Sequence, residues 1–464
     1  MSAVVSTINE KAYAPYWNAQ YAESVSKLWL PHETVLHGLA GNSWTLSSKN
    51  PAAKSWFSIN VWEAQKKSSP KTSCISSTFS LAECMGDESI KVIRSKKIRF
   101  YPTTAQKNLF RRWFGVSRRI YNKTVEHLAT PGTIADWKAI KQWLIPAQPE
   151  YTFEVPRAIR DGAVMDACRA VKAAKVKTKQ TGNPHKVRFR SKREPTQTLF
   201  IRNDMIRKGT VYPTKLGVLS FSESLPEHPR DSRITWENGR WFMCVPHEIT
   251  LSPGARTKPY YAVGVDPGVR TFLSFYTDGA VGDLGEGDFG RIARLCAYLD
   301  DLMSRLDPKR KENRVNAAKR QRMRKAANRL RWKIKDLIRE VHWKCARFLC
   351  ENFEVVFIPD FETQQMASRT KRKLRKKSVR AMLTWSHYQF RQRLEWMAKK
   401  LGTTVISVNE SYTSKTVNWT GEVNHKLGGA RIVKGSDGNS MKRDHNGALG
   451  IYLKGFVGYG LTKC

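Results

Sequence analysis

The chain has 464 residues, 41% of them hydrophobic, which suits about three domains with packed cores. It carries 81 Lys and Arg against 40 Asp and Glu, and the resulting net charge of +41 is tolerated most easily beside a polyanion. Nucleic acid is therefore the expected partner. A membrane protein is not expected, because no apolar run approaches roughly 18 residues and neither end carries a lipidation signal.

The eight cysteines are scattered and form no Cys-x-x-Cys pair. The first ten residues also lack the basic-then-apolar plan of a secretion signal. We therefore expect reduced thiols in a protein that is not secreted, with no disulfide framework and no cysteine zinc site. Cytoplasm or nucleus is the expected compartment. Residues 1–89 form an N-terminal extension whose role the sequence does not indicate.

The first elements that the sequence predicts are a strand and a helix. Apolar and polar residues alternate from Ile90 to Tyr101, which predicts a strand that Pro102 ends. Thr103 or Thr104 can cap the helix that follows, whose apolar residues recur at spacings of three and four. Its basic residues either form a solvated face or contact phosphates. They are Arg111, Arg112, Arg118 and Arg119.

A second helix is predicted from Pro156 to Lys175, and short strands follow between Lys186 and Ile249. The pair Asn238-Gly239 is a hairpin turn signal. With the strand near Ile90, this stretch is typical of a small antiparallel barrel interrupted by helices. The strands are expected at Val187–Arg190, Thr198–Ile201, Gly217–Phe221 and Ile234–Trp241.

An aspartate at a strand end is the most informative feature of the chain. The β-rich run Tyr260–Val265 delivers Asp266 into the turn Pro267-Gly268, and a hairpin follows that turns at Asp278-Gly279. Ribonuclease-H-like nucleases place the first ligand of a metal pair in this way. Asp266 alone could equally cap a turn, as Asp before Pro often does.

A strongly basic helix is predicted next, because 13 of the 27 residues from Lys309 to Lys335 are Lys or Arg. An apolar stripe continues from Leu330 to Phe348 and predicts a core-facing side, so the cations must be solvated or lie at a nucleic-acid groove. The candidate nucleic-acid contacts here are Lys319, Arg320, Arg322, Arg324 and Lys325.

Two further strands and a second basic run follow. The strand Glu354–Ile358 ends at Pro359-Asp360, and eight of the twelve residues from Arg369 to Arg380 are cations. This run could be a nuclear-import signal, a phosphate-binding lid or a solvated loop; we favour the lid and include Arg372 and Lys373 among the nucleic-acid contacts. A helix from Trp385 to Leu401 and a strand from Thr403 to Val408 then lead to Asn409-Glu410.

A second informative aspartate, Asp444, opens an apolar, helix-like run in the string Arg443–Ala448. Carboxylates brought together from such places hold the divalent ions that assist phosphodiester hydrolysis. The order of Asp266 and Asp444, with basic helices between them, favours a nuclease over two turn caps.

The motifs from about Lys91 to Tyr452 resemble those of the TnpB family of transposon-encoded RNA-guided nucleases and their eukaryotic and viral relatives, the Fanzor proteins. Two strings match that family's opening strand and first helix, and three match its split RuvC nuclease domain. The first two are Ile98–Thr103 and Arg118–Lys123, which adds Tyr121, Asn122 and Lys123 to the candidate nucleic-acid contacts. The other three are Gly264–Gly268, Tyr412–Thr416 and Arg443–Ala448.

The resemblance implies an α/β multidomain protein: a small wedge β-barrel (90–104 and 186–257), a helical recognition lobe (105–185) and an RNase H-like RuvC domain (258–464). It also implies an RNA-guided endonuclease that uses two magnesium ions and cuts double-stranded DNA beside a short target-adjacent motif. A structured guide RNA would then be the partner of a monomeric ribonucleoprotein. Nuclear residence follows if the chain comes from the eukaryotic or viral branch, and cytoplasmic residence otherwise.

The sequence departs from the family at its second carboxylate. Pro359 stands at the strand end where the family usually has it, and Fanzor-like members with Pro-x-Phe-Glu-Thr move the glutamate to just before the Tyr-Thr-Ser-Lys-Thr string. In this chain that residue is Glu410. The resemblance therefore implies Asp266, Glu410 and Asp444 as catalytic, magnesium-binding residues.

The second departure is the family's zinc ribbon, expected at about 412–441. Its cysteine positions fall on Val417, Thr420, Lys434 and Asp437, so we expect no structural zinc and an insertion that is held by packing alone or is partly disordered. Loss of these ligands leaves an alternative open, a nuclease-inactive regulator that binds DNA through a guide RNA. A basic structural or RNA-packaging protein would explain the charge but not the acids.

Overall fold

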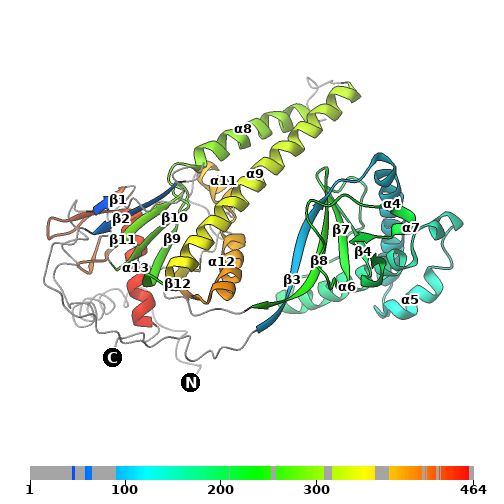
Figure 1. Ribbon diagram of the computed structural model, residues 1–464, viewed down its shortest axis with the longest axis horizontal. Coiled ribbons are helices and arrows are strands. Elements are labelled where there is room, and N and C mark those ends of the chain that lie inside the picture. The colour runs from blue at the N-terminus through cyan, green and yellow to red at the C-terminus, as the bar shows by residue number, and fades with distance from the viewer. Residues whose placement is uncertain are drawn as a thin grey trace. The chain divides into compact units, whose positions relative to one another are not determined.

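The protein is seen here in a computed structural model that describes residues 44–46, 58–64, 90–207, 209–251, 258–278, 280–307, 316–360, 376–409, 413, 415–424, 428 and 430–458. The chain forms two compact units (Figure 1). The smaller unit is Ile90–Leu251, and the larger one joins Met1–Ser89 to Ser252–Cys464. Both combine sheets with helices, so the expected α/β multidomain class is confirmed.

The smaller unit is built on an antiparallel sheet of four strands in the order β3-β8-β7-β4. The bounds are β3 Ile90–Phe100, β8 Arg240–Leu251, β7 Ser232–Glu237 and β4 Thr196–Ile201. The turn between β7 and β8 is Asn238-Gly239, with φ of 46° and 88°. Two positive φ values in succession suit the twist of a two-residue hairpin, which confirms the sequence prediction there.

Two long helices pack on this sheet, α4 (Thr104–Leu128) and α6 (Arg157–Thr181). Thr103 caps α4 in a reciprocal capping box with Gln106, as its position before the helix predicted. Phe110 of α4 lies 5.2 Å from the ring of Trp241, and an added Cβ at Gly162 of α6 would meet Phe200 at 2.6 Å. The shorter elements are α5 Trp137–Leu144, η1 Glu150–Glu154, η2 Asn203–Met205, β5 Ile206–Arg207, β6 Thr210–Val211 and α7 Pro213–Leu216.

The expected wedge barrel is wrong for the described residues, where this sheet stays open between its edge strands β3 and β4. Two predicted strands are absent. The backbone N–H and C=O of Arg190, in the stretch 187–190, are bonded to the Asn122 side chain of α4 instead of to a neighbouring strand. In the stretch 217–221, only Phe221 bridges to β3, at Phe100.

The larger unit is built on a sheet of seven strands in the order β1-β2-β11-β10-β9-β12-β13. The bounds are β1 Trp44–Leu46, β2 Ile59–Ala64, β9 Tyr260–Pro267, β10 Leu273–Thr277, β11 Ala280–Leu284, β12 Phe353–Pro359 and β13 Thr404–Val408. Strands β9, β12 and β13 run parallel, and the others pair antiparallel. Trp44–Leu46 and Ile59–Ala64 of the N-terminal extension thus supply two strands that the sequence did not indicate.

Helices cover both faces of this sheet (Figure 1). On one face lie α9 (Ala317–Asn352) and α12 (His387–Leu401), with α8 (Phe289–Leu306) beside α9; α11 (Lys376–Trp385) precedes α12. On the other face lies α13 (Arg443–Gly458). Side chains of β9 alternate accordingly: Val263 and Val265 join the α9 core, and Ala262 joins the α13 core. A strand buried on both faces reads as a continuous apolar run, as Tyr260–Val265 does.

The predicted apolar stripe of the basic helix is confirmed, because Ile334, Val341 and Cys345 of α9 are buried in the core. The helix begins at Ala317, and residues 309–315 lie outside the described part of the chain. The helix predicted from Trp385 to Leu401 is confirmed as α12, which begins two residues later, because Ser386, with φ of 53°, separates it from α11. No helix in the described ranges is long and apolar enough to cross a membrane.

Candidate nuclease site

Asp266 lies near the end of β9, on the face of the sheet that α13 covers. A Cβ added at Gly447 of α13 would lie 2.4 Å from the Oδ2 atom of Asp266. One step back along β9, a Cβ added at Gly264 would lie 2.4 Å from the carbonyl oxygen of Ala448. Glycine at both positions therefore lets the first turns of α13 pack directly on the strand end that carries Asp266.

Asp444 is an exposed residue of the first turn of α13. It precedes Gly447 by three residues, so the two positions lie on one side of the helix, about a turn apart. A carboxylate in the first turn is also favoured by the helix dipole. The fold therefore brings the elements that carry the two predicted aspartates into direct contact.

Strand register shows which residues share the face of Asp266. Ser274 of β10 is the cross-strand neighbour of Asp266. On the other side of β9, Phe357 of β12 pairs with Gly264. Two residues further along both strands, Pro359 therefore lies beside Asp266. Pro359 also pairs with Val408 of β13. Glu410, two residues after Val408, lies outside the described residues, as does Glu362.

Asp360 belongs to the opposite face. Its carboxylate accepts a hydrogen bond from Arg391 of α12 at 2.6 Å and another from the Ser407 hydroxyl. The hydrogen bond from Ser407, followed by that from Arg391, holds the pKa of Asp360 below its usual range. One residue along a strand reverses the side chain's direction, which is why Pro359 shares the face of Asp266 and Asp360 does not.

Sequence reasoning overlooked Asp283, a carboxylate 2% exposed in the middle of β11. Its Oδ1 accepts hydrogen bonds from Ser274 Oγ at 2.7 Å and from His445 Nε2 at 3.0 Å, and its Oδ2 accepts one from Lys442 Nζ at 3.2 Å. Burial by itself would raise the pKa of Asp283, but these partners lower it below its ordinary value. An Asp inside a short, otherwise apolar strand was the available signal.

The string around Thr416 is joined to α13 by buried amides. The Asn446 side chain accepts a hydrogen bond from the Asn418 backbone at 2.9 Å and donates one to the Thr416 carbonyl at 2.7 Å. Asn418 in turn donates to the Asn446 carbonyl at 2.7 Å. Two strings that are 28 residues apart in the sequence thus form one buried unit beside Asp444.

The predicted zinc-ribbon positions lie in two small hairpins. Their strands are β14 Thr416–Val417, β15 Glu422–Val423, β16 Ile432–Lys434 and β17 Ser440–Lys442. Val417 is buried in the α13 core, and Asp437 accepts a hydrogen bond from the Trp419 indole at 3.1 Å. Within the described residues no group of three or more His, Cys, Asp and Glu side chains could hold a metal.

The candidate nucleic-acid contacts differ in exposure. Tyr121 is buried under the guanidinium of Arg190, 3.8 Å from the ring centre, and Asn122 is bonded to the Arg190 backbone. Both contribute to packing within the smaller unit. Arg372 and Lys373 lie outside the described residues. The exposed members are Arg111, Arg112, Arg119, Lys123, Lys319, Arg322, Arg324 and Lys325, and Arg118 and Arg320 are half-buried.

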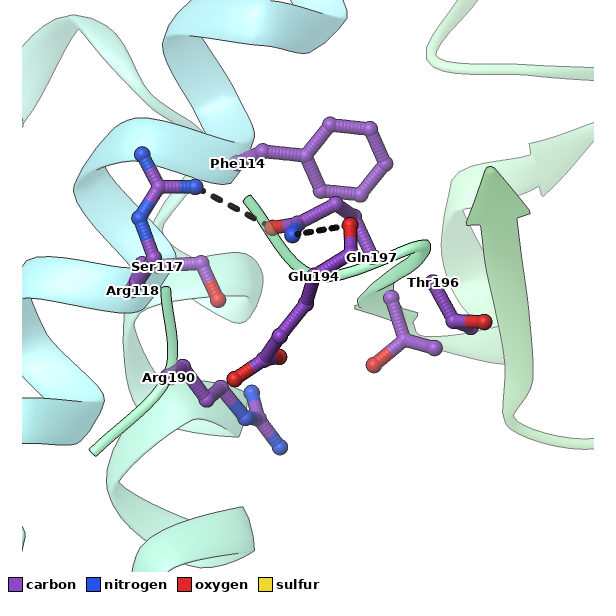
Figure 2. Close-up of a pocket in the computed structure, with 8 residues that line it drawn as sticks. Phe114, Ser117, Arg118, Arg190, Glu194, Thr196 and Gln197 are labelled. Atoms are coloured by element: carbon purple, nitrogen blue, oxygen red, sulfur yellow. Dashed lines mark hydrogen bonds between the residues drawn. The ribbon is translucent and has the colours of Figure 1, made fainter. Parts of the chain in front are cut away.

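A polar pocket lies beside α4 in the smaller unit (Figure 2). Arg118 donates to the Gln197 side-chain oxygen at 3.1 Å across this pocket, and burial lowers the pKa of Arg118. The Gln197 amide nitrogen donates in turn to the Glu194 carbonyl at 3.4 Å. The guanidinium and amide are thus held by neighbours within the unit. The pocket is lined by Phe114, Ser117, Arg118, Arg190, Glu194, Thr196, Gln197 and Thr198.

Comparison with known proteins places these features in context. Residues 387–451 match the family described as Cas12f1-like, TNB domain, and residues 91–129 match the family described as Helix-turn-helix domain. A TnpB-like protein of Acanthamoeba polyphaga mimivirus is 23% identical over 409 residues, covering 79% of this chain and 74% of the relative. The chain resembles the TnpB-like proteins.

Two further relatives carry other descriptions. A "Putative transposase" of Paramecium bursaria Chlorella virus 1 is 25% identical over 401 residues, 78% of this chain and 87% of that protein. A "Putative RNA-guided DNA endonuclease" of Streptomyces pristinaespiralis is 24% identical over 357 residues, 73% of this chain and 83% of that protein. Among solved structures, a Cas12f1–sgRNA–target DNA complex aligns with a TM-score of 0.44 at 12% identity, covering 78% of this chain and 99% of that chain.

Proposed function

We propose that the chain is an RNA-guided, magnesium-dependent DNA endonuclease that cuts guide-matched DNA next to a short target-adjacent motif. The observation that carries the proposal is the contact between Asp266 and Gly447, which joins the two aspartates' elements at one edge of the sheet. The reaction class is suggested by the relative described as a "Putative RNA-guided DNA endonuclease", beside the TnpB-like relatives.

Asp266 and Asp444 suit magnesium, because carboxylate oxygens are the hard ligands that this ion prefers. The close approach at Gly447 leaves no room for a side chain between Asp266 and α13, which also fits a site formed by the two elements together. Asp266, Glu410 and Asp444 would hold the ions. When bound, the ions would supply a Lewis acid and a water of lowered pKa for phosphodiester hydrolysis.

Glu410 completes the proposed set by its place in the sequence. It comes two residues after Val408, the residue of β13 that pairs with Pro359 on the face of Asp266. Its competitor Asp360 is already neutralised by Arg391 on the other face. We therefore assign the third carboxylate to the segment that follows β13 and not to β12.

The basic helices would hold nucleic acid through its backbone. The exposed cations of α4 and α9 suit an A-form heteroduplex, which proteins read by shape while base pairing with the guide reads sequence. Specificity would then rest on the guide RNA, and the salt dependence of binding on these cations.

The test is cleavage by the purified ribonucleoprotein. RNA that copurifies with the chain is sequenced, and DNA carrying the matching target is incubated with the complex in magnesium or in EDTA. Magnesium-dependent cutting of matched DNA alone supports the proposal. Guide-dependent binding without cutting would indicate the nuclease-inactive regulator, and binding that ignores the guide would indicate an RNA-packaging protein.

A further inference from the structure

We propose that Asp283 is a positioning residue that, through Ser274, Lys442 and His445, sets the metal-binding geometry of Asp266 and Asp444. We further infer that the N-terminal strand β2 completes this network. The inference rests on the proposed function and concerns the same site. None of these four residues is assigned contact with substrate, so their role is to hold the residues that do.

A row of cross-strand neighbours connects Asp283 to Asp266. Asn60 of β2 pairs with Asp283, Asp283 with Ser274, and Ser274 with Asp266. Directly opposite residues of antiparallel strands point to the same face, about 5 Å apart. The row therefore runs under α13 from the N-terminal strand to the proposed metal ligand, and the Ser274 hydroxyl donates along it to Asp283 at 2.7 Å.

The same carboxylate connects the sheet to the start of α13. His445 follows Asp444 directly and donates from Nε2 to Asp283 at 3.0 Å, while Lys442, just before the helix, donates to the other oxygen at 3.2 Å. Asp283 thus binds both sides of the helix start. Because Asp444 lies between Lys442 and His445, these two bonds restrain the position of its backbone.

Burial makes this network costly to disturb. Asp283 and His445 have side chains only 2% and 7% exposed, so a bond lost at either leaves a polar group without water to replace its partner. Lys442 is half exposed and also pairs with Glu286 at 3.3 Å. Lys442 thus brings a positive charge from the surface to the buried carboxylate of Asp283.

Strand β2 of the N-terminal extension packs against the network of Asp283, Lys442 and His445. The Trp62 ring of β2 lies 5.0 Å from Lys442 Nζ and 5.9 Å from the ring of His445. Just before β2, the backbone N–H and the hydroxyl of Ser58 each donate to Asp288 at 2.7 Å. These contacts attach β2 to β11 and α8 and keep the Lys442–Asp283 pair partly covered.

A metal-binding measurement tests the role of Asp283 directly. Manganese binding to the complex of the protein with its guide RNA is followed by electron paramagnetic resonance. The proposed site accounts for the part of the bound manganese that is lost in Asp266→Ala. Asp283→Asn keeps the shape but removes the charge and sets an amide N–H₂ against at least one of the three donors, so we expect about tenfold weaker manganese binding at that site, the scale typical for residues that orient metal ligands. The magnesium concentration for half-maximal cleavage should rise by a similar factor.

Asp166→Asn is the matched control. Asp166 is a carboxylate of the smaller unit that is 9% exposed and held by Arg233 at 2.6 Å and Arg190 at 3.1 Å. Its replacement removes a comparable buried ion pair, so it should lower thermal stability without changing the half-saturating metal concentration. Lys442→Met provides a second variant at a half-exposed position, with the same expected weakening of metal binding as Asp283→Asn.

The results separate the inference from the proposed function. Unchanged metal affinity in Lys442→Met and in folded Asp283→Asn, in a wild type that cleaves DNA, overturns the positioning role alone. A loss of cleavage at saturating metal with no shift in the half-saturating concentration also overturns it, since that is the signature of a smaller folded fraction. A wild type with neither Asp266-dependent manganese binding nor cleavage contradicts the proposed function itself.

Discussion

At the scale of single residues, direction along a strand decides which acids can act together. Asp266 and Pro359 share one face of the sheet, and Asp360, a single residue later, pairs with Arg391 on the other. Glycine is equally informative. Gly447 permits the approach of α13 to Asp266, and any side chain there would occupy the position of the carboxylate.

Replacing Asp266 or Asp444 by Ala should reduce cleavage at least a thousandfold, because each change removes a charge that the proposed magnesium ions require. Guide-dependent DNA binding should persist, since neither residue belongs to the exposed cations of α4 and α9. Cleavage and filter-binding assays of the same preparations measure the two effects. Wild-type cutting by Asp266→Ala would refute the metal assignment.

Glu410→Gln should be as inactive as Asp266→Ala, because the amide keeps volume and hydrogen bonding but loses the charge. Asp360→Asn is the comparison variant: it weakens the pairing with Arg391 and should retain cleavage within a few-fold. Initial rates at saturating magnesium distinguish the two. An active Glu410→Gln together with an inactive Asp360→Asn or Glu362→Gln would reverse the assignment.

At the scale of elements, the interface between β10, α9 and α12 is built around an aromatic stack that requires neutral imidazoles. Phe272 lies between His342 and His387, with ring centres 5.3 and 5.2 Å away. His342 donates from Nε2 to the Trp385 carbonyl at 2.7 Å and accepts at Nδ1 from Arg393. Burial, and then the charge of Arg393, lower the pKa of His342 to about 3.

The stability of the larger unit should therefore fall as the pH drops below about 6.5. The folded-state pKa of His342 lies below the unfolded value near 6.5, so the unfolded chain binds more protons between those values. The contribution of neutral His342 to the free energy of unfolding is complete above pH 6.5 and declines by up to about 1.4 kcal/mol per pH unit toward about pH 3. His342→Gln, which keeps a donor for the Trp385 carbonyl, should flatten the profile in urea unfolding at fixed ionic strength. An unchanged slope would contradict the neutral state.

At the scale of the whole molecule, the net positive charge is the main influence expected on solubility and stability at low salt. The net charge of +41 arises from cations spread over several elements of both units. Such self-repulsion destabilises compact states at low salt unless a polyanion neutralises it. The basic helices are therefore expected to depend on nucleic acid for solubility as well as to bind it.

The purified chain should carry RNA, and removing that RNA should lower its solubility and its melting temperature at low salt. Counterion release should make RNA affinity fall steeply as salt rises. Light scattering and thermal unfolding before and after ribonuclease treatment, at low and high salt, measure the effect. A stable, RNA-free chain that cuts DNA without a guide would contradict the guided mechanism.

The sequence by itself determined many of the local elements, and its charge predicted a polyanionic partner. Alternation predicted β3, the Thr103 cap predicted the start of α4, Asn238-Gly239 predicted a hairpin, and an apolar stripe predicted the buried side of α9. These signals are reliable because they depend on backbone preferences and side-chain periods within a few residues. The sequence also proposed Asp266 and Asp444, because Asp266 follows the β-rich run Tyr260–Val265 and Asp444 opens an apolar, helix-like run; their metal-binding role stays a prediction.

Only the tertiary structure decided which distant segments meet. It added β1 and β2 from the N-terminal extension to the seven-stranded sheet, and it paired Asp283 with His445, 162 residues later. It also left 187–190 without a strand partner, because Asn122 satisfies the backbone there. A strand edge or a buried charge can be satisfied by any suitable partner in the chain, so short-range patterns cannot select one; packing in three dimensions does.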